Sequence, residues 1–310
     1  MKATLYHLGN VVIDIVSQVP HLPVRGGDLI AQDGLTVPGG AFNVMAAATR
    51  QGLPTVYAGL LGSGPFGTLA EDGLIREGIS WVNPRLPNAD TGFVICLIDP
   101  EGERTFVTNL GAEATLLPRH LGAISPRLGD ILYISGYSLV LAPNRDTIIG
   151  WLKTIAPDII RVFDPGPLVG DIPDDILCQI LHQSHWVTLN RREAALLTGA
   201  DLIESQANQL IKRTPAGQVV IRDGANGCAL AQRNTPLVLV PGFSVPVLDT
   251  NGAGDTHAGT FLARLALGDP PTRAARWANA AAAISTTHLG PATAPTQRDV
   301  MQWLASTADS

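Results

Sequence analysis

The residue types best suited to chemistry lie in one short run, DTNGAGD at residues 249–255. Strand-like apolar residues precede this run and apolar residues at helical spacing follow it, so a glycine turn is expected to begin a helix. Unpaired N–H groups at a helix N-terminus attract anions, and the small residues Gly252, Ala253 and Gly254 let an anion come close. Asp255 adds a carboxylate that can accept a proton. The run predicts transfer of a phosphoryl group to a hydroxyl; a tight connection capped by Asp255 is the alternative.

Asp14 is a second carboxylate in an unusual place, because it interrupts the apolar run at 11–16. A charge in such a run is costly unless something pairs with it. An ionised carboxylate can accept two hydrogen bonds, so a pair of sugar hydroxyls is a suitable partner. A solvated residue on the open face of a strand is the alternative.

A glycine-containing loop is expected directly before a helix, where the sequence reads PGGAFN at 38–43. Gly39 and Gly40 allow the backbone to approach a ligand, and Asn43 offers both a donor and an acceptor. A simple loop with a helix cap is the alternative.

Two further polar groups follow predicted strands. Asn190 and Glu193 come after the strand expected at 186–189, and their i,i+3 spacing places both on one helix face. They are equally consistent with a capping box, in which each side chain bonds the other residue's backbone N–H. The segment RDGANG at 222–227 joins two strand-like runs and predicts a turn or hairpin.

Short apolar runs alternate with helical patterns, which predicts an α/β fold with a mostly parallel sheet covered on both faces. The expected strands are 5–8, 11–16, 55–60, 93–98, 105–107, 131–134, 159–163, 186–189, 219–221, 228–231 and 237–240. The expected helices are 42–51, 66–77, 145–155, 174–182, 191–197, 204–213, 255–267, 272–287 and 296–306. Ligands of such folds bind at the carboxyl ends of the strands, where Asp164 is expected.

Two segments, about 11–37 and 91–108, break this alternation. The first lacks a helix, and the second predicts a hairpin around DPEG at 99–102. Strands without helices do not join the main layer easily, so we expect a small separate sheet that forms a lid over the cleft. Residues 1–310 are expected to form one domain. A small open sheet has exposed edges, so a homodimer through the lid is a further expectation.

Composition excludes several classes of function. The formal net charge of -6 at pH 7 gives no electrostatic basis for binding nucleic acid or an anionic membrane. Cys96, Cys178 and Cys228 have no zinc-binding spacing and are expected to be reduced thiols. The first residues are too polar for a signal peptide, and no apolar stretch is long enough to span a bilayer, so a cytoplasmic protein is expected.

One segment fits a different enzyme, because GSGPFG at 62–67 matches the GxGxxG pattern of a nicotinamide dehydrogenase. The match lies outside the first strand–helix unit, and Pro65 removes an N–H from the phosphate cradle. Asp90 is the nearest acidic residue at the distance expected for a ribose contact. A non-catalytic sugar sensor is the other alternative, but Asp255 and the glycines of the 249–255 run are all present.

These motifs, in this order, resemble those of the ribokinase family of carbohydrate and nucleoside kinases, also called the PfkB family. The run at 249–255 is similar to its C-terminal signature, GNVVID at 9–14 to its G-N-x-x-x-D, 38–43 to its G-G-x-x-x-N, and 190–193 to its N-x-x-E. The resemblance extends from Gly9 to Thr293 and implies a three-layer α/β/α fold with a β-sheet lid, ATP as co-substrate, and Mg²⁺. Only two residues separate Gly40 from Asn43, and position 41 lacks the Lys of ribokinases, which weakens the case for ribose itself.

The resemblance also implies roles for individual residues. Asp255 is implied to be the general base, and the N–H groups of Gly252, Ala253 and Gly254 to stabilise the transferring phosphoryl group. The implied substrate contacts are Asn10, Asp14, Gly39, Gly40 and Asn43. The implied nucleotide contacts are Asn190, Glu193, Arg222, Gly224, Gly227 and Asn279, of which Asn190 and Glu193 act near Mg²⁺ through water. A loop for K⁺ is implied at Asp249, Asn251, Ser285, His288, Gly290 and Thr293.

We therefore expect an ATP-dependent kinase that phosphorylates a hydroxymethyl group of a furanose-type carbohydrate or ribonucleoside. Asn10 and the apolar residues Val12, Ala41 and Phe42 favour a nucleoside-specific enzyme as the alternative to a free-sugar kinase. For Asn279, a buried polar residue on an Ala-rich helix is the alternative to a contact with adenine.

Overall fold

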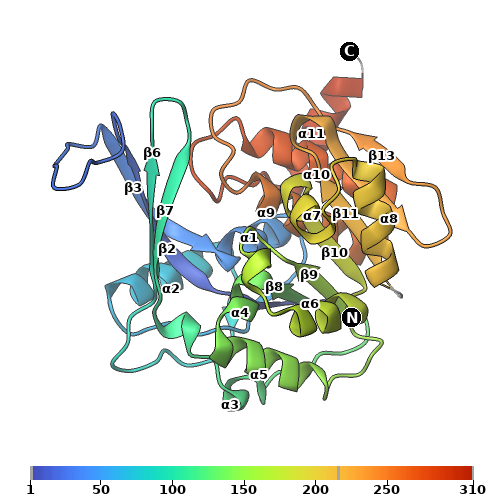
Figure 1. The fold of residues 1–310 in the computed structure, drawn as a ribbon, viewed down its shortest axis with the longest axis horizontal. Helices are drawn as coiled ribbons and strands as arrows, with labels where there is room; N and C mark the ends of the chain where they lie inside the picture. The colour runs from blue at the N-terminus through green and yellow to red at the C-terminus, as the bar shows by residue number, and fades with distance from the viewer. Residues whose placement is uncertain (1–2, 215–216, 309–310) are drawn as a thin grey trace.

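A large sheet forms the centre of the molecule (Figure 1), in a computed structural model that describes residues 3–214 and 217–308. Its strands are β1 (Leu5–Leu8), β4 (Thr55–Tyr57), β5 (Ser80–Trp81), β8 (Ile131–Ser135), β9 (Ile160–Asp164), β10 (Trp186–Asn190), β11 (Gln218–Arg222), β12 (Gly227–Gln232) and β13 (Val238–Pro241). They lie in the order β13-β12-β11-β10-β9-β8-β1-β4-β5. All neighbours from β11 to β5 are parallel, whereas β12 and β13 pair antiparallel at one edge. The expected mostly parallel sheet is confirmed.

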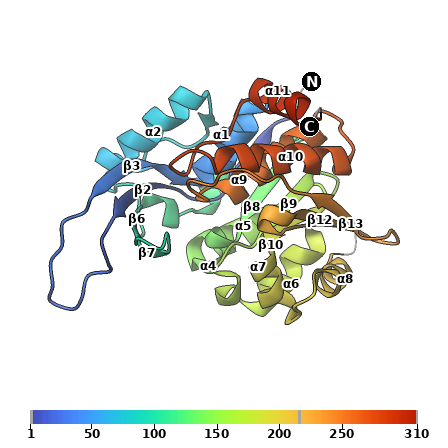
Figure 2. The ribbon, with the colours of Figure 1, turned by 90° about the horizontal axis from the view of Figure 1, so that it is seen from above.

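Helices cover both faces of this sheet, as Figure 2 shows. One side carries α1 (Ala41–Arg50), α2 (Pro65–Glu77), α9 (Ala253–Ala266), α10 (Pro271–Ser285) and α11 (Gln297–Ala308). The other side carries α4 (Gly136–Val140), α5 (Ala142–Leu152), α6 (Asp174–Gln183), α7 (Arg191–Thr198) and α8 (Ile203–Arg213), and the short α3 (Pro118–Leu121) lies beside α5.

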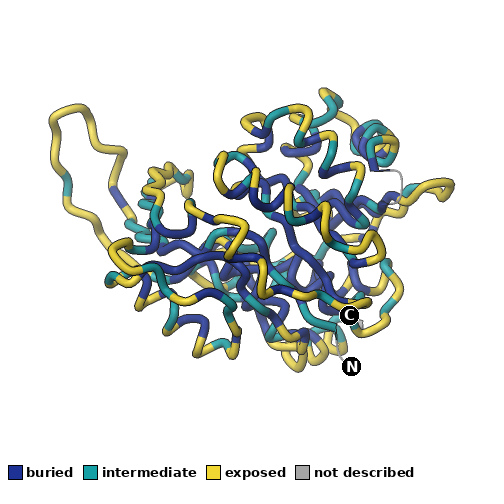
Figure 3. Tube along the Cα trace, turned by 90° about the horizontal axis from the view of Figure 1, so that it is seen from below, coloured by how far each residue is buried: buried dark blue, intermediate teal, exposed yellow. Residues whose placement is uncertain are grey.

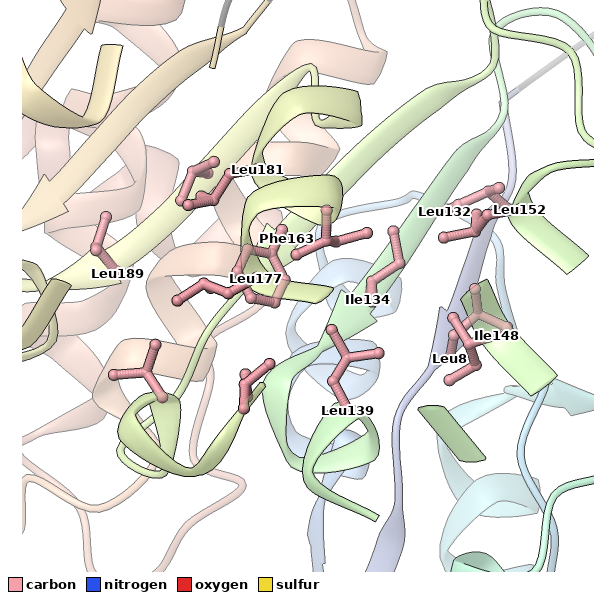
Figure 4. Close-up of a cluster of buried hydrophobic side chains, with 14 of the residues drawn as sticks. Leu8, Leu132, Ile134, Leu139, Ile148, Leu152, Phe163, Leu177, Leu181 and Leu189 are labelled. Atoms are coloured by element: carbon pink, nitrogen blue, oxygen red, sulfur yellow. The ribbon is translucent and has the colours of Figure 1, made fainter. Parts of the chain in front are cut away.

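Side chains alternate between these two layers along each strand. Tyr133 of β8 belongs to the cluster with α1, α9 and α10, while its neighbours Leu132 and Ile134 belong to the cluster with α5 and α6. Figure 4 shows the second cluster, in which Phe163 of β9 lies close to Leu177 of α6. Because both faces are buried, the central strands are mostly apolar, which is why the sequence predicts them well.

A second, smaller sheet lies beside the main one, in the order β3-β2-β6-β7. Its strands are β2 (Val11–Gln18), β3 (Asp33–Gly40), β6 (Phe93–Ile98) and β7 (Arg104–Asn109). The expectation of a loop at residues 38–40 is wrong, because these residues end β3 and pair with β2. The hairpin expected around 99–102 is confirmed by the antiparallel pairing of β6 with β7.

The connection between β2 and β3 extends away from the body of the molecule (Figure 3). Residues 20–28 are exposed. Among the residues that the structure describes, no helix combines the length and apolar character needed to cross a membrane.

Candidate active site

The site forms where the N-terminus of α9 meets the carboxyl ends of the central strands. Gly252 is the N-cap of α9 and has a φ of 72°, in the left-handed region that favours glycine. A Cβ atom at this position would lie 1.8 Å from the carbonyl oxygen of Pro291. Val247 and Leu248, expected to be strand-like, instead lie in an irregular exposed segment whose next residue, Asp249, donates its N–H to the carbonyl of Thr286.

Asp255 lies in the first turn of α9 and is held by a residue from another helix. The Nδ2 atom of Asn43, in α1, donates to Oδ2 of Asp255 over 3.0 Å. The two helices can approach this closely because of Gly259, where a Cβ would lie 2.4 Å from the carbonyl oxygen of Val44. The alternative in which Asp255 caps the helix is wrong, since Gly252 is the N-cap and no side chain caps it. Asn43 and Asp255 therefore form one polar unit.

Asn43 also keeps a free acceptor, because its Oδ1 atom is buried and has no hydrogen-bond partner. A buried acceptor without a partner is costly in a folded protein. A ligand hydroxyl donating to this oxygen would remove that cost, and it would then lie next to the carboxylate of Asp255.

Asp14 faces the same site from the small sheet. Its carboxylate lies over Gly39 of β3, where a Cβ would be 2.1 Å from Oδ2 of Asp14. Gly39 is therefore needed for space rather than for a turn. Burial, and to a smaller extent the nearby charge of Asp255, raise the pKa of Asp14 to about 7. The carboxylates of Asp14 and Asp255 are close enough to repel each other. Such a site favours a ligand that donates hydrogen bonds, such as a polyol.

The same environment raises the pKa of the candidate base. The pKa of Asp255 is raised to about 6, mainly by burial. The hydrogen bond from Asn43 and the charge of Arg222 lower this pKa, whereas the charge of Asp164 raises it. A carboxylate with a pKa near the working pH is better matched to accepting a proton than an ordinary Asp.

These shifts predict the pH dependence of activity. Asp255 can accept a proton only when it is ionised, and Asp14 accepts hydrogen bonds best when it is ionised. The pKa values of Asp14 and Asp255 are about 7 and about 6. We therefore expect kcat/KM to fall as the pH is lowered through this range. Activity measured between about pH 5 and 9 would check this. Activity that stays constant from about pH 9 down to about pH 5, as expected if these carboxylates had the usual Asp pKa of about 3.9, would contradict it.

Asn190 and Glu193 form the capping box that the sequence allows. The Asn190 side chain accepts from the backbone N–H of Glu193 over 2.8 Å, and the Glu193 carboxylate accepts from both the backbone N–H and the Nδ2 of Asn190, each over 2.8 Å. This closed arrangement fixes a buried carboxylate at the start of α7. A role toward Mg²⁺ or nucleotide remains a prediction for both residues.

An arginine with two carboxylate neighbours lies between this box and α9. Arg222 ends β11; its Nη1 donates to Oγ1 of Thr188 over 2.6 Å and lies 3.4 Å from Oδ2 of Asp164, while its Nη2 lies 3.7 Å from Oε2 of Glu193. The pKa of Glu193 is raised to about 6, first by burial and then by the charge of Asp164, while the charge of Arg222 acts in the opposite direction. The cluster thus combines negative charge with one fixed cation.

Two aromatic residues near this cluster were missed by the sequence analysis. Tyr133 donates its hydroxyl to Oδ2 of Asp164 over 2.9 Å. Tyr137 is half-exposed at the start of α4, and its pKa is raised to about 12, first by burial and then by the charges of Asp255, Glu193, Asp164 and Asp14. No local pattern marks either residue, but both come from the carboxyl end of β8 and its continuation, where ligands of such folds bind.

Arg104 is a further residue that sequence reasoning missed. It begins β7 of the small sheet, and its guanidinium group donates to Asp249 and to Oγ1 of Thr250. Asp249 also accepts from the backbone N–H groups of Asn251 and Gly290 over 2.8 and 2.9 Å. The small sheet is therefore tied directly to the loop that begins α9.

The residues implied for K⁺ lie together around this loop. Oγ1 of Thr293 donates to the carbonyl oxygen of Ser285 over 3.0 Å and lies 3.4 Å from that of Gly290. The Ser285 carbonyl also accepts from the backbone N–H of His288 over 3.2 Å. Both lone pairs of the Ser285 carbonyl are thus used within the protein.

The side chains of two implied ligand contacts, Asn10 and Asn279, have partners within the protein. Oδ1 of Asn10 lies 3.1 Å from Oγ of Ser138 and 3.4 Å from Nδ2 of Asn144. Asn279 is buried; its Nδ2 donates to two carbonyls of β13 over 3.0 Å each, and its Oδ1 contacts His257. These contacts match the buried polar alternative for Asn279. Gly224 and Gly227 form the confirmed turn between β11 and β12, with φ values of 56° and 96°.

The glycine segment at 62–67 is already filled by a protein carboxylate. Asp90 accepts from the backbone N–H groups of Phe66 and Gly67 over 3.1 and 2.8 Å. A Cβ at Gly62 would lie 2.2 Å from the backbone of Asp90. Asp90 therefore occupies the N-terminus of α2, where the dehydrogenase alternative needs a dinucleotide phosphate.

Comparisons with known proteins show what the whole chain is similar to. The family model described as pfkB family carbohydrate kinase matches residues 2–298. The chain is 33% identical over 300 residues to a sugar kinase of Escherichia coli (strain K12) named YegV and described as uncharacterized, covering 95% of this chain and 92% of the relative. It is 30% identical to a fructokinase of Klebsiella pneumoniae, covering 97% and 99%. The crystal structure of ribokinase from Thermotoga maritima superposes with a TM-score of 0.83 at 26% identity, covering 98% of this chain and 100% of that one.

Proposed function

The chain belongs to the pfkB family of carbohydrate kinases and is a sugar kinase with ATP as co-substrate, and we propose that it phosphorylates a hydroxymethyl group of a furanose-type sugar or ribonucleoside. The observation that carries this proposal is the contact of Asn43 with Asp255 at the N-terminus of α9, with Asp14 facing the same site. A base, an anion-binding helix end and a set of hydroxyl acceptors thereby lie together.

Each part has a chemical role in the proposed transfer. Asp14 and the free Oδ1 atom of Asn43 accept hydrogen bonds from substrate hydroxyls and orient the sugar. Asp255 takes the proton of the hydroxymethyl group as its oxygen attacks the γ-phosphorus. The N–H groups at 252–254 stabilise the charge that develops on the phosphoryl oxygens.

The nucleotide side of the proposal rests on the cluster at the ends of β9, β10 and β11. Hard carboxylate and amide oxygens suit Mg²⁺, and the repulsion between Asp164 and Glu193 would be relieved by a cation. Asn190 and Glu193 would hold Mg²⁺ through water. Bound Mg²⁺ would neutralise charge on the ATP phosphates.

A monovalent cation fits the loop at 249–251 only in part. The Ser285 carbonyl is used by two donors, and Asp249 is paired with Arg104, so K⁺ would depend on the remaining backbone carbonyls of the two segments. To test whether K⁺ activates the enzyme, turnover is compared in KCl and NaCl at equal ionic strength. A faster rate in KCl would support a K⁺ site at this loop, and equal rates would contradict it.

The nucleoside alternative has lost part of its support. Ala41 and Phe42 belong to the buried cluster beneath the small sheet, so they provide no apolar wall for a base. The Asn10 side chain is used by Ser138 and Asn144. A panel of free furanoses and ribonucleosides, assayed for ADP release with Mg-ATP, decides between the two classes. Turnover with neither class would contradict the proposal.

Replacing Asp14 by Asn is expected to weaken sugar binding more than ATP binding. The change removes an ionised acceptor but keeps the shape of the side chain, so KM for the sugar should rise roughly 10–100-fold, as for loss of a charged hydrogen bond. KM for ATP should stay near the wild-type value. Steady-state kinetics with each substrate varied in turn measures both, and an unchanged KM for the sugar would count against the role of Asp14.

A homodimer through the small sheet also remains a proposal. β7 is an edge strand, and its side chains Phe106 and Val107 are more than half exposed. An exposed apolar edge of this kind can pair with a second copy. Light scattering gives the mass in solution, and a monomer at all concentrations tested would contradict the proposal.

A further inference from the structure

We propose that Arg104 takes the place of a monovalent cation in this kinase, because its guanidinium group neutralises Asp249 and thereby positions the turn at 249–252. Arg104 is a positioning residue, since it acts on the phosphoryl group only through this turn. The inference rests on the proposed anion-binding role of residues 252–254. It makes the kinase independent of K⁺.

Asp249 is the residue that holds the turn together. Its Oδ1 atom accepts from the backbone N–H of Asn251 over 2.8 Å, and its Oδ2 atom accepts from that of Gly290 over 2.9 Å. The carbonyl oxygen of Pro291, the residue after Gly290, lies so close to Gly252 that a Cβ there would be 1.8 Å away. One carboxylate therefore orders both chain segments that meet at the N-cap of α9.

The charge of this carboxylate needs a partner. Asp249 is only 9% exposed, and a buried charge is costly unless an opposite charge lies against it. Arg104 supplies that charge, because Nη2 of its guanidinium group pairs with Oδ1 of Asp249. Its Nη1 atom donates to Oγ1 of Thr250 over 3.1 Å. A cation is thus built into the protein at the start of the turn.

The oxygen atoms that the resemblance implies for K⁺ are largely engaged by protein donors. Both carboxylate oxygens of Asp249 accept from backbone N–H groups, and one of them also contacts Arg104. The Ser285 carbonyl accepts from Oγ1 of Thr293 and from the N–H of His288. K⁺ needs oxygen ligands that can replace its hydration water, and a guanidinium group on the same carboxylate repels it. The loop therefore fits a fixed guanidinium group better than K⁺.

The small sheet delivers this built-in cation. Arg104 is the first residue of β7 and pairs with Ile98, the last residue of β6. The same sheet meets the second segment through Leu35 of β3, whose Cδ2 atom would lie 3.4 Å from a Cβ at Gly290. Arg104 reaches Asp249 only while the small sheet is docked on the loop, whereas a dissolved ion would not need the sheet. The competing explanation is that Arg104 only fastens the sheet to the body of the protein.

The test compares salts of different cations at equal ionic strength. Wild-type turnover and the wild-type thermal midpoint are expected to be equal in KCl, NaCl and tetramethylammonium chloride, because the site carries its own cation. Arg104→Ala is expected to lower kcat roughly 10–100-fold in tetramethylammonium chloride, as for loss of charged hydrogen bonds. This variant leaves Asp249 without a partner and leaves space for an ion. KCl is therefore expected to restore part of its activity and to raise its thermal midpoint.

Two further variants serve as controls. Arg104→Lys keeps the charge but loses the second donor group, so it should retain most of the activity and should not respond to KCl. Arg25→Ala is the matched control, because Arg25 is exposed in the connection between β2 and β3 and should behave as the wild type. Thermal unfolding shows whether each variant is folded. If Arg104→Ala does not fold, the wild type and Arg104→Lys decide by the same comparison of salts.

A purely structural role predicts a different result. Arg104→Ala would then have a lower thermal midpoint in every salt, and KCl would not restore its activity. That result overturns the proposal, as does wild-type kcat in Arg104→Ala or activation of the wild-type protein by KCl. Absence of turnover with any sugar would overturn the proposed function instead, and the thermal midpoints in the three salts would still test Arg104.

Discussion

Replacing Asp255 by Asn is expected to lower kcat by roughly 10²–10⁴-fold, the range for loss of a general base. Asn keeps the size of the side chain and can still accept the hydrogen bond that Asn43 donates over 3.0 Å. What it loses is the capacity to take the proton of the substrate hydroxyl. The loss should therefore appear in kcat, with the fold and the affinity for ATP close to wild type. Steady-state kinetics and calorimetry with ATP measure the two quantities.

A matched control is Asp72→Asn, because Asp72 is exposed on α2 and belongs to neither cluster of the site. It makes the same chemical change without touching the proposed base and should leave kcat unchanged. Wild-type turnover in the Asp255 variant would remove the general base from the account. A loss of ATP affinity equal to the loss of kcat would instead assign Asp255 to nucleotide binding.

Replacing Gly252 by Ala is expected to lower kcat/KM for ATP by roughly 10²–10³-fold, because the anion-binding N–H groups are displaced. The new Cβ would lie 1.8 Å from the carbonyl oxygen of Pro291, and the backbone has a φ of 72°. The left-handed conformation alone costs a residue other than glycine about 1–2 kcal/mol. The loop at 249–252 must therefore move, and the thermal midpoint should fall as well.

Gly150→Ala is the matched control for this change. Gly150 lies within α5, has no left-handed φ, and its Cβ would meet no atom within 4 Å. Ala at such a helical position is expected to stabilise the protein by about 0.5–1 kcal/mol and to leave activity unchanged. Thermal unfolding and kinetics of the two variants separate the effect of the loop from that of the substitution itself. Wild-type kcat/KM in the Gly252 variant would contradict the anion-binding role.

The main sheet could be predicted from the sequence because each of its central strands can be recognised from its own residues. Each central strand is buried on both faces, so it appears as a short apolar run between helical patterns. β3 was missed for the opposite reason. Residues 33–36 are exposed, and Pro38, Gly39 and Gly40 have the composition of a turn, so only the pairing with β2 makes them a strand.

The candidate site divides in the same way. The position of the proposed base Asp255 in the first turn of a helix, the glycine that precedes that helix, and the capping box of Asn190 and Glu193 follow from short-range spacing. Contacts between distant segments do not. Arg104 pairs with Asp249, which lies 145 positions away, and Asn43 reaches Asp255 across 212 positions. Such pairs depend on how the small sheet and α1 pack against α9.

The sequence also does not show which atoms occupy the space that a glycine leaves free. Gly39 was expected to allow a ligand close to the backbone, whereas its missing side chain makes room for the carboxylate of Asp14. The segment at 62–67 has the spacing of a phosphate-binding turn, but Asp90 fills it. In both places the sequence identified a glycine that matters, and packing determined what the glycine accommodates.

The position of the phosphate on the product tests the central claim most directly. The protein is incubated with Mg-ATP and the furanose or ribonucleoside that gives the highest turnover, and the product is examined by correlated proton and phosphorus NMR. We predict that the phosphorus couples to the two protons of the hydroxymethyl carbon, and that this signal does not form with Asp255→Asn. Phosphorus coupled to the anomeric or a ring proton, or ADP released with inorganic phosphate and no sugar phosphate, would contradict the account.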